Sequence, residues 1–217
     1  MSIRYGARSR PGTMVSTWLN GLVSGTVPVF AGYFGGGKTS TQVTTVDRFL
    51  FSDDSRTTLS TGLSATTRSL GAMASDVAGY FGGGFNDDPA DDEVTTVDRF
   101  LFSNDSRTTL GTGLSAATQA LAGMASTVAG YFGGGDAFGA TVNRFLFSDD
   151  SRTTLGTGLS ASRSHLAGMA SADAGYFGGG YSGPTTDVDR FLFSDDSRTT
   201  LGTGLSAGTG KLAAMAS

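Results

Sequence analysis

Carboxylates gather in one short segment of the chain, between residues 86 and 93. The segment reads Asn-Asp-Asp-Pro-Ala-Asp-Asp-Glu, and its five carboxylates are Asp87, Asp88, Asp91, Asp92 and Glu93. Carboxylate oxygens are the ligands that Ca²⁺ takes in proteins, so these residues are a weak candidate for a calcium site. Their spacing is not the ordered spacing of an EF-hand loop. This favours a solvated acidic loop, and we expect no obligatory metal or cofactor.

The other reactive residues do not indicate a catalytic cluster. His165 is the only histidine, and there is no cysteine, which excludes thiol-based chemistry. A lone histidine without a nucleophile and an orienting acid makes a poor triad. The acidic pairs Asp53-Asp54, Asp149-Asp150 and Asp195-Asp196 recur at equivalent places, where Asp side chains typically cap the backbone of a turn. The sequence therefore predicts a protein that is not an enzyme.

These residues lie within four copies of one block, which fill the chain from about residue 30 onward. Each copy contains Ala-Gly-Tyr-Phe-Gly-Gly-Gly, a variable stretch, and then Val-(Asp/Asn)-Arg-Phe-Leu-Phe-Ser. The glycine triplets begin at Gly35, Gly82, Gly133 and Gly178. A period of this length, rich in glycine and β-formers, is typical of β-propellers with one antiparallel four-stranded blade per copy. We expect an all-β fold with a four-bladed propeller over residues 29–217.

The order of expected strands predicts how the ring closes. In the second blade we expect strands over residues 70–75, 78–81, 95–102 and 107–113, and the Asp-Arg pair of the third strand is expected to bond between blades. The chain enters this pattern at a second strand (30–34) and leaves it at a first strand (212–217). Pairing of these two pieces would close four blades and leave no sheet edge. An open array, or two chains pairing into a larger ring, are the alternatives.

Residues 1–28 differ from the repeats. They contain the only tryptophan, and their charged residues are all arginines, whereas the whole chain has a net charge of −4. We expect an extended arm that anchors the protein to a neighbour, with two alternatives: a secretory signal, or a segment folded against its own propeller. The apolar stretch is too interrupted for a membrane span, and the acidic body argues against nucleic acid as a partner. The candidate anchoring residues are Arg4, Arg8, Arg10, Trp18, Leu19 and Leu22.

The repeats resemble known families. Gly-Tyr-Phe-Gly-Gly-Gly followed by Val-Asp-Arg-Phe resembles a kelch-type repeat, although Thr57-Thr58-Leu59 stands where kelch repeats have a tryptophan. The longer pattern, with Val-Asp-Arg-Phe-Leu-Phe-Ser-Asp-Asp-Ser, resembles repeat proteins of bacteriophages, especially cyanophages, and of bacterial genomes. This resemblance implies a virion protein, such as a head decoration or tail appendage, present in several copies or as a homo-oligomer and docked on other virion proteins through the arm.

Differences between the copies predict the binding face. Length varies only in the second-to-third-strand loops (38–45, 85–96, 136–141 and 181–187), and residue types vary in the connections that lead to the next blade. Both regions emerge at one end of an antiparallel blade, and such a face is often the binding face. The candidate ligand-binding residues are Arg68, Phe85, Gln119, Phe138, Arg163, His165, Tyr181 and Lys211.

We therefore expect a virion protein that binds a host surface glycan or protein through this face. The alternative is a bacterial scaffold propeller, cytoplasmic or secreted, that holds protein partners. A carbohydrate-active enzyme is the weakest reading, because no acid–base pair is unique to one copy.

Overall fold

Short antiparallel strands and turns make up the described part of the chain. The computed structural model describes residues 31–87, 92–136, 139–181 and 183–216, and contains β-strands but no helix in these ranges. No helix there is long and apolar enough to span a membrane. The expected anchoring arm (1–28, with Arg4, Arg8, Arg10, Trp18, Leu19 and Leu22) and Phe138 lie outside the described residues. The prediction of an all-β fold is confirmed for the described residues.

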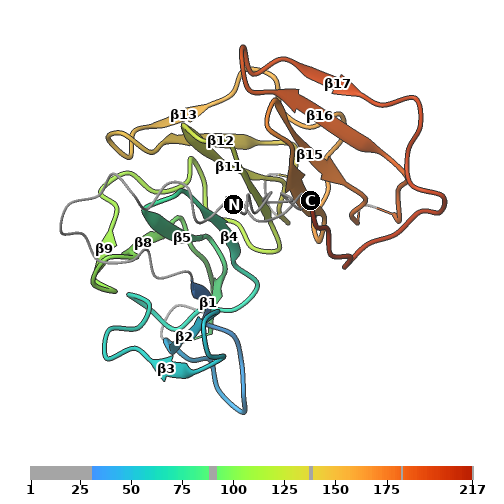
Figure 1. The fold of residues 1–217 in the computed structure, drawn as a ribbon. Helices are drawn as coiled ribbons and strands as arrows, with labels where there is room; N and C mark the ends of the chain where they lie inside the picture. The colour runs from blue at the N-terminus through green and yellow to red at the C-terminus, as the bar shows by residue number, and fades with distance from the viewer. Residues whose placement is uncertain (1–30, 88–91, 137–138, 182, 217) are drawn as a thin grey trace, which may run out of the picture. The chain divides into compact units, whose positions relative to one another are not determined.

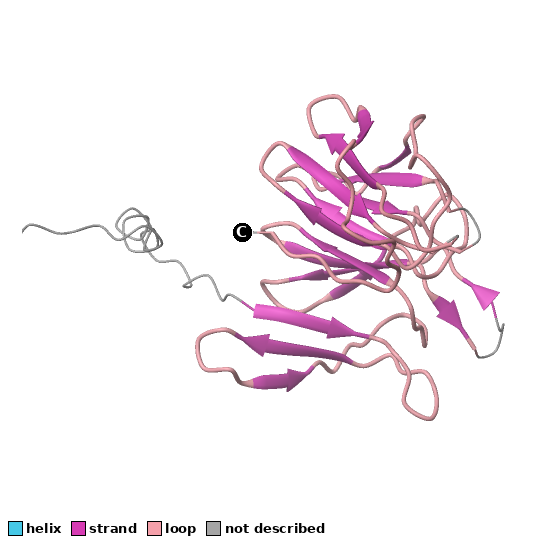
Figure 2. Cartoon of the chain, turned by 90° about the vertical axis from the view of Figure 1, so that its right-hand side faces the viewer, coloured by secondary structure: helices cyan, strands magenta, loops and turns pink. Residues whose placement is uncertain are grey.

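Each copy of the repeat forms one antiparallel sheet, and the four sheets follow one another along the chain (Figures 1 and 2). We number them in chain order. Sheet 1 contains β1 (Ala31–Gly35), β2 (Val46–Leu50) and β3 (Arg56–Thr58). Sheet 2 contains β4 (Gly71–Ala74), β5 (Ala78–Gly82), β8 (Val97–Leu101) and β9 (Arg107–Thr109). Sheet 3 contains β10 (Ala122–Ala125), β11 (Ala129–Gly133), β12 (Val142–Leu146) and β13 (Arg152–Thr154). Sheet 4 contains β14 (Ala167–Ala170), β15 (Ala174–Gly178), β16 (Val188–Leu192) and β17 (Arg198–Thr200). A two-stranded ribbon, β6 (Phe85–Asn86) with β7 (Asp92–Glu93), extends from sheet 2.

The turns that join the third and fourth strands are built by the repeated acidic pair. The first residue caps the turn: the Ser55 amide donates to Asp53 Oδ1 at 3.0 Å, and Ser151 and Ser197 do the same to Asp149 and Asp195. These hydrogen bonds hold the pKa of each capping carboxyl below its usual value. The predicted turn role of these residues is confirmed. The fourth strand is shorter than expected, because only three residues pair before the chain turns away.

The second residue of each acidic pair joins neighbouring sheets. Tyr33 of sheet 1 donates to Asp105 of sheet 2 at 2.7 Å, and Arg48 bonds to the same carboxylate. The same three-residue contact joins sheets 2 and 3 through Asp150, and sheets 3 and 4 through Asp196. Burial, and then the hydrogen bond to Asp105, raises the pKa of Tyr33 to about 12. The prediction that the Asp-Arg strand bonds between blades is thus confirmed for its arginines.

Aromatic rings fill the space between sheets. Phe81 of β5 contacts Gly35 of sheet 1, Phe132 contacts Gly82 of sheet 2, and Phe177 contacts Gly133 of sheet 3. All three rings are nearly inaccessible to solvent. A side chain on the contacted glycine would occupy the position of the ring, so the glycine that ends the Ala-Gly-Tyr-Phe-Gly strand serves packing between sheets. Full burial of one such ring contributes about 1.5–3 kcal/mol.

The first strands of sheets 2, 3 and 4 approach one another most closely. Strand β10 lies beside β4 and β14, and a Cβ atom on Gly123 would overlap the carbonyl oxygen of Ala72. A Cβ on Gly168 would likewise overlap the carbonyl oxygen of Gly123. Glycine at these two positions therefore sets the spacing of the inner strands.

The structure corrects the prediction of a ring closed by the C-terminal strand. Sheet 1 has three strands, and residues 213–216 pair with none of the described strands. Met215 is 87% exposed, whereas Met73, at the same place in sheet 2, is 7% exposed. Part of the physical reason is at residue 214, where alanine replaces the glycine of β10 and β14. At the spacing of β10 and β14, its Cβ would overlap the preceding strand.

Candidate functional site

Four equivalent residues, one from each connection between repeats, surround an open concavity. They are Ser69, Ala120, His165 and Lys211, and all four have a left-handed backbone conformation with φ between 53° and 58°. Such a conformation costs a non-glycine residue about 1–2 kcal/mol, so the surrounding structure must impose it. The same strained position therefore recurs in every repeat with a different side chain each time, and we call these four residues the frame.

A relay of backbone hydrogen bonds imposes this frame. The amide of Ala120 donates to the carbonyl of Ser69 at 2.7 Å, and the amide of His165 donates to that of Ala120 at 2.7 Å. The amide of Lys211 continues the relay to the carbonyl of His165 at 2.8 Å. Only peptide groups take part, so the side chains at these four positions are not needed to hold the frame.

The residues that line the concavity fall into two sets: we call the four frame residues its rim, and the leucines that follow them its floor. Its volume is about 290 Å³, close to the lower end of the range for ligand sites. Each frame residue is followed by a leucine, and these leucines (Leu70, Leu121, Leu166 and Leu212) also line the concavity. Two rim residues have nitrogen-containing side chains that can form hydrogen bonds with a ligand: the imidazole of His165 and the ammonium group of Lys211. This arrangement suits a ligand with one apolar surface and several hydrogen-bonding groups.

One more candidate, Tyr181, lies next to the rim residues. His165 Nδ1 is 3.1 Å from the Ser164 hydroxyl and 3.9 Å from Asp136 Oδ1. Tyr181 is 51% exposed, its backbone pairs with that of Ser164, and its ring contacts Gly210, the residue before Lys211. The structure thus brings the predicted residues His165, Tyr181 and Lys211 together.

Arg68 and Phe85 form a separate cluster at the loop of sheet 2. Their backbones pair, and the Arg68 guanidinium lies 4.6 Å from the centre of the Phe85 ring. Arg68 also pairs with Asp87 at 3.3 Å, and Lys38 pairs with Asp87 at 2.9 Å. Chiefly through the hydrogen bond from Lys38, the pKa of Asp87 is lowered. Both candidates are therefore engaged by groups of the protein itself.

The candidate calcium ligands do not meet as a site in the described residues. Asp87 is paired with two cations, Asp92 caps the amide of Glu93, and burial raises the pKa of Glu93. No group of three acidic or histidine side chains suited to a metal occurs in the ranges that the structure describes. Asp88 and Asp91 lie outside those ranges.

Gln119 faces the loop of sheet 3. Its carbonyl accepts a hydrogen bond from the amide of Asp136 at 3.1 Å. Equivalent backbone contacts join Arg68 to Phe85 and Ser164 to Tyr181. These three connections therefore lie against the variable loop of the following sheet, and the two kinds of variable segment meet there.

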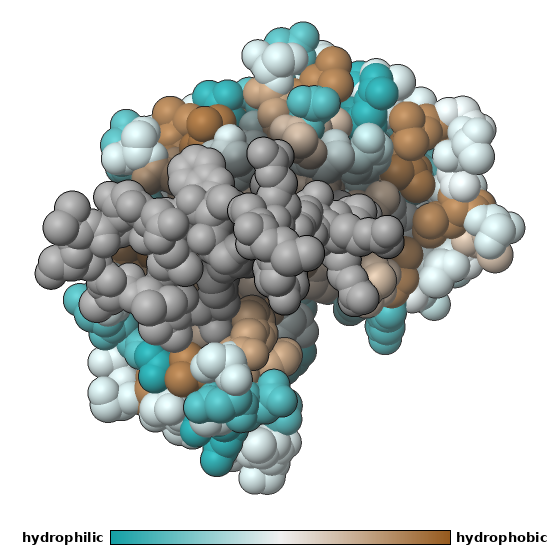
Figure 3. Space-filling view, in the orientation of Figure 1, coloured by the Kyte–Doolittle hydropathy of each residue, from teal (hydrophilic) through white to brown (hydrophobic). Residues whose placement is uncertain are grey.

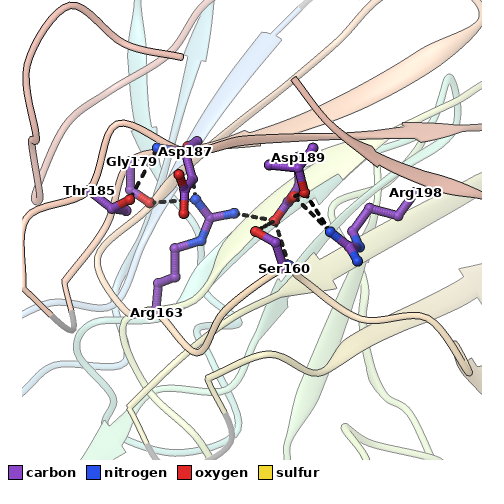
Figure 4. A network of polar contacts seen from close by, with 8 residues as sticks. Ser160, Arg163, Gly179, Thr185, Asp187, Asp189 and Arg198 are labelled. Carbon is purple, nitrogen blue, oxygen red and sulfur yellow. Dashed lines mark hydrogen bonds and ion pairs between the residues drawn. The ribbon is translucent and has the colours of Figure 1, made fainter. Parts of the chain in front are cut away.

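Arg163 is not a surface residue, which contradicts its prediction as a ligand contact. Its side chain is 1% exposed and points into sheet 4 (Figure 4). There it donates to the carbonyls of Gly179 at 3.1 Å and Asp187 at 2.8 Å, and to Asp189 Oδ2 at 2.5 Å. Burial opposes ionisation of Asp189, but hydrogen bonds from Thr200 and Ser160 and the Arg163 charge keep its pKa below the usual value. Arg163 holds sheet 4 together and is not available to a ligand.

Sequence reasoning missed half of the frame. Ser69 and Ala120 occupy the same repeat position as His165 and Lys211, but their side chains are small and neutral. The leucine that follows each frame residue was a signal within the sequence, because it recurs in all four copies while the residue before it changes.

The fold and the concavity define the class of this protein: an all-β repeat protein whose four related antiparallel sheets present variable residues on a constant backbone. No protein-family model matches the chain, and no curated protein matches it.

Proposed function

We propose that this chain is a propeller-type recognition protein that binds a host surface glycan at the concavity and is carried on a phage virion. The observation that supports binding is the frame itself. Four positions share one backbone conformation and one hydrogen-bond relay, yet carry Ser, Ala, His and Lys. At three of these positions, Ser69, His165 and Lys211, the varying side chain is at least partly exposed and is therefore available for contact with something outside the chain.

The chemistry of the rim favours a sugar. A pyranose ring has apolar faces and a circumference of hydroxyl groups, and the concavity offers an apolar floor beside His165 and Lys211. Tyr181 adds an exposed aromatic ring next to Lys211. The Lys211 ammonium favours acidic sugars. A shallow site of this volume binds weakly alone, and many copies on one particle supply avidity.

The binding test uses the full chain on an array of neutral and acidic glycans. Lys211→Ala and His165→Ala should each reduce the signal of the bound glycan about tenfold or more. Lys38→Ala is the matched control, because it removes the same charge from a loop that does not line the concavity. Binding that survives both rim variants, binding lost only in the control, or no binding to any glycan would contradict the proposal.

The virion placement rests on the resemblance of the repeats to phage proteins and is tested separately. Mass spectrometry of purified virions should recover the chain. If the chain is absent from virions but still binds glycans, the proposed virion location is wrong and the proposed recognition function stands.

A further inference from the structure

Every junction between neighbouring sheets uses the same set of contacts. Among the described residues, sheet 4 has the donor residues of this set without their acceptor, and sheet 1 has the acceptor without its donors. At each junction, a tyrosine and an arginine of one sheet bond to an aspartate of the next. The same tyrosine stacks on a phenylalanine of the next sheet: Tyr33 on Phe102, Tyr80 on Phe147 and Tyr131 on Phe193, with ring centroids 5.3–5.6 Å apart. Among the described residues, sheets 1, 2 and 3 each have a following neighbour, and sheet 4 has none.

Sheet 4 presents the donor half. Its tyrosine and arginine are Tyr176 and Arg190, and neither has a side-chain hydrogen bond or ion pair among the described residues. Gly178 is also uncovered: the equivalent glycines of the other sheets each contact a phenylalanine ring, whereas the atom nearest to Gly178 belongs to Val188 of the same sheet.

Sheet 1 presents the acceptor half. Asp54 stands at the position of Asp105, Asp150 and Asp196, and all four have a φ of 57–58°. Asp54 bonds to no tyrosine or arginine among the described residues. Phe51, the counterpart of the stacked ring Phe102, is 66% exposed. Phe34, the counterpart of Phe81, is 71% exposed instead of 8%. Figure 3 shows hydrophobic residues at the surface between hydrophilic ones.

The strands are unmatched in the same way. No described strand pairs with β1 in the way that β4, β10 and β14 pair in the other sheets. Residues 213–216 repeat the sequence of those first strands and are unpaired. The backbone relay also has two open ends among the described residues, the amide of Ser69 and the carbonyl of Lys211.

We propose that these halves meet between two copies of this chain, so that sheet 4 of one copy docks head-to-tail on sheet 1 of the next. Residues 213–216 of one copy add to β1 of the other as its missing strand. The register of sheet 2 pairs Gly71 with Gly82 and Ala72 with Phe81. By the same register, Ala213 lies opposite Gly35 of the second copy, and Ala214 lies opposite Phe34.

The other contacts follow from the existing junctions. Arg190 and Tyr176 bond to Asp54 of the second copy, and the ring of Phe34 covers Gly178. The Ser69 amide of the second copy donates to the Lys211 carbonyl of the first. The backbone relay therefore continues from one copy to the next, and residues of both copies line the concavity. The contact is heterologous, so successive junctions close a ring if the rotation allows. Two copies joined at both ends form the simplest such ring.

The observation that selects a second copy over the chain's own first sheet is alanine at residue 72, which faces the position of the missing first strand. Ala72 stands where the interior strands have Gly123 and Gly168. At the interior spacing, a Cβ there would overlap the neighbouring carbonyl oxygen. Closure within one chain must follow the spacing set by the connected sheets. A second copy is not bound by that connection and can dock at the wider spacing that alanine requires.

Cysteine cross-linking tests the contact, because the natural chain has no cysteine. Phe34→Cys and Ala214→Cys chains are prepared separately, mixed and oxidised. Opposed strand residues lie within the Cα separation that a disulfide needs. We expect a reducible product of twice 22.1 kDa that contains one chain of each kind. Asp53→Cys, on an exposed turn of sheet 1, is the control partner for Ala214→Cys and should give little product.

A chain that carries both cysteines distinguishes the alternatives. Closure within one chain would give an oxidised monomer from this double variant and no mixed product from the single variants, and either result would overturn the proposal.

A charge exchange tests the same contact without cysteine. Asp54→Arg and Arg190→Asp should each weaken self-association, measured by sedimentation, at least about tenfold. The double variant should restore it. Asp76→Arg, on an exposed turn of sheet 2, makes the same charge change away from both ends and should have no effect. A wild-type chain that stays at 22.1 kDa at every concentration would overturn the proposal.

Discussion

Replacement of Arg163 by threonine tests whether this residue stabilises sheet 4. Threonine is the matched substitution, because Thr67, Thr118 and Thr209 occupy the same position in the other repeats. The change removes two hydrogen bonds to backbone carbonyls and one ion pair to Asp189, all from a side chain that is 1% exposed.

The expected change in the free energy of unfolding depends on the contacts that Asp189 keeps in the Arg163→Thr variant. Loss of one partner of a buried ion pair costs roughly 3–5 kcal/mol, because the other charge is left buried. Asp189 keeps its hydrogen bonds from Ser160 and Thr200 and its contact with Arg198 at 3.2 Å. Asp98 in sheet 2 is held by the equivalent serine and threonine without a buried arginine. We therefore expect the free energy of unfolding to fall by roughly 2–4 kcal/mol.

Urea denaturation followed by circular dichroism measures this change. Arg198→Thr is the control, since Arg198 contacts the same carboxylate from a side chain that is 25% exposed and should cost about 1 kcal/mol or less. A change below about 0.5 kcal/mol for Arg163→Thr, the range of ordinary surface substitutions, would refute the assignment of Arg163 to the interior.

Three further predictions concern the backbone and the pH response. Gly123→Ala should lower the melting temperature, because its Cβ would overlap the Ala72 carbonyl oxygen, whereas Gly156→Ala, with open space around it, should leave it unchanged or raise it. Ala120→Gly should raise the free energy of unfolding by about 1 kcal/mol, because glycine adopts the φ of 56° without strain; a loss of stability in urea denaturation would contradict this reading. Because the pKa of Asp189 is lowered in the folded protein, its contribution is present above the unfolded value of about 3.9 and is lost as the pH falls below it. The melting temperature should thus decrease as the pH is lowered below about 4. The melting temperature of the Asp189→Asn variant should decrease less over the same range, and an equal decrease would rule out Asp189 as the titrating group.

The sequence predicted local structure better than long-range closure. Strands, turns and the inter-sheet arginines follow from patterns that repeat within each copy, so Asp53 and Arg48 were assigned correctly. Closure depends on the spacing between strands far apart in the chain, and the relevant signal was alanine at residues 72 and 214 in place of the glycine found in β10 and β14. Arg163 was misplaced because a variable position of a connection is usually exposed. Nothing in the local pattern shows that its side chain turns inward to Asp189.

The backbone relay at Ser69, Ala120, His165 and Lys211 has a consequence for how this protein can change over generations. Near-identical repeats recombine readily at the level of DNA, and exchange between them shuffles the residues at the four frame positions. Because only peptide groups make the relay, each recombinant inherits an intact scaffold with a new arrangement of rim side chains. A gene of this kind can generate new combinations of rim side chains by rearranging copies it already holds, without waiting for new point mutations.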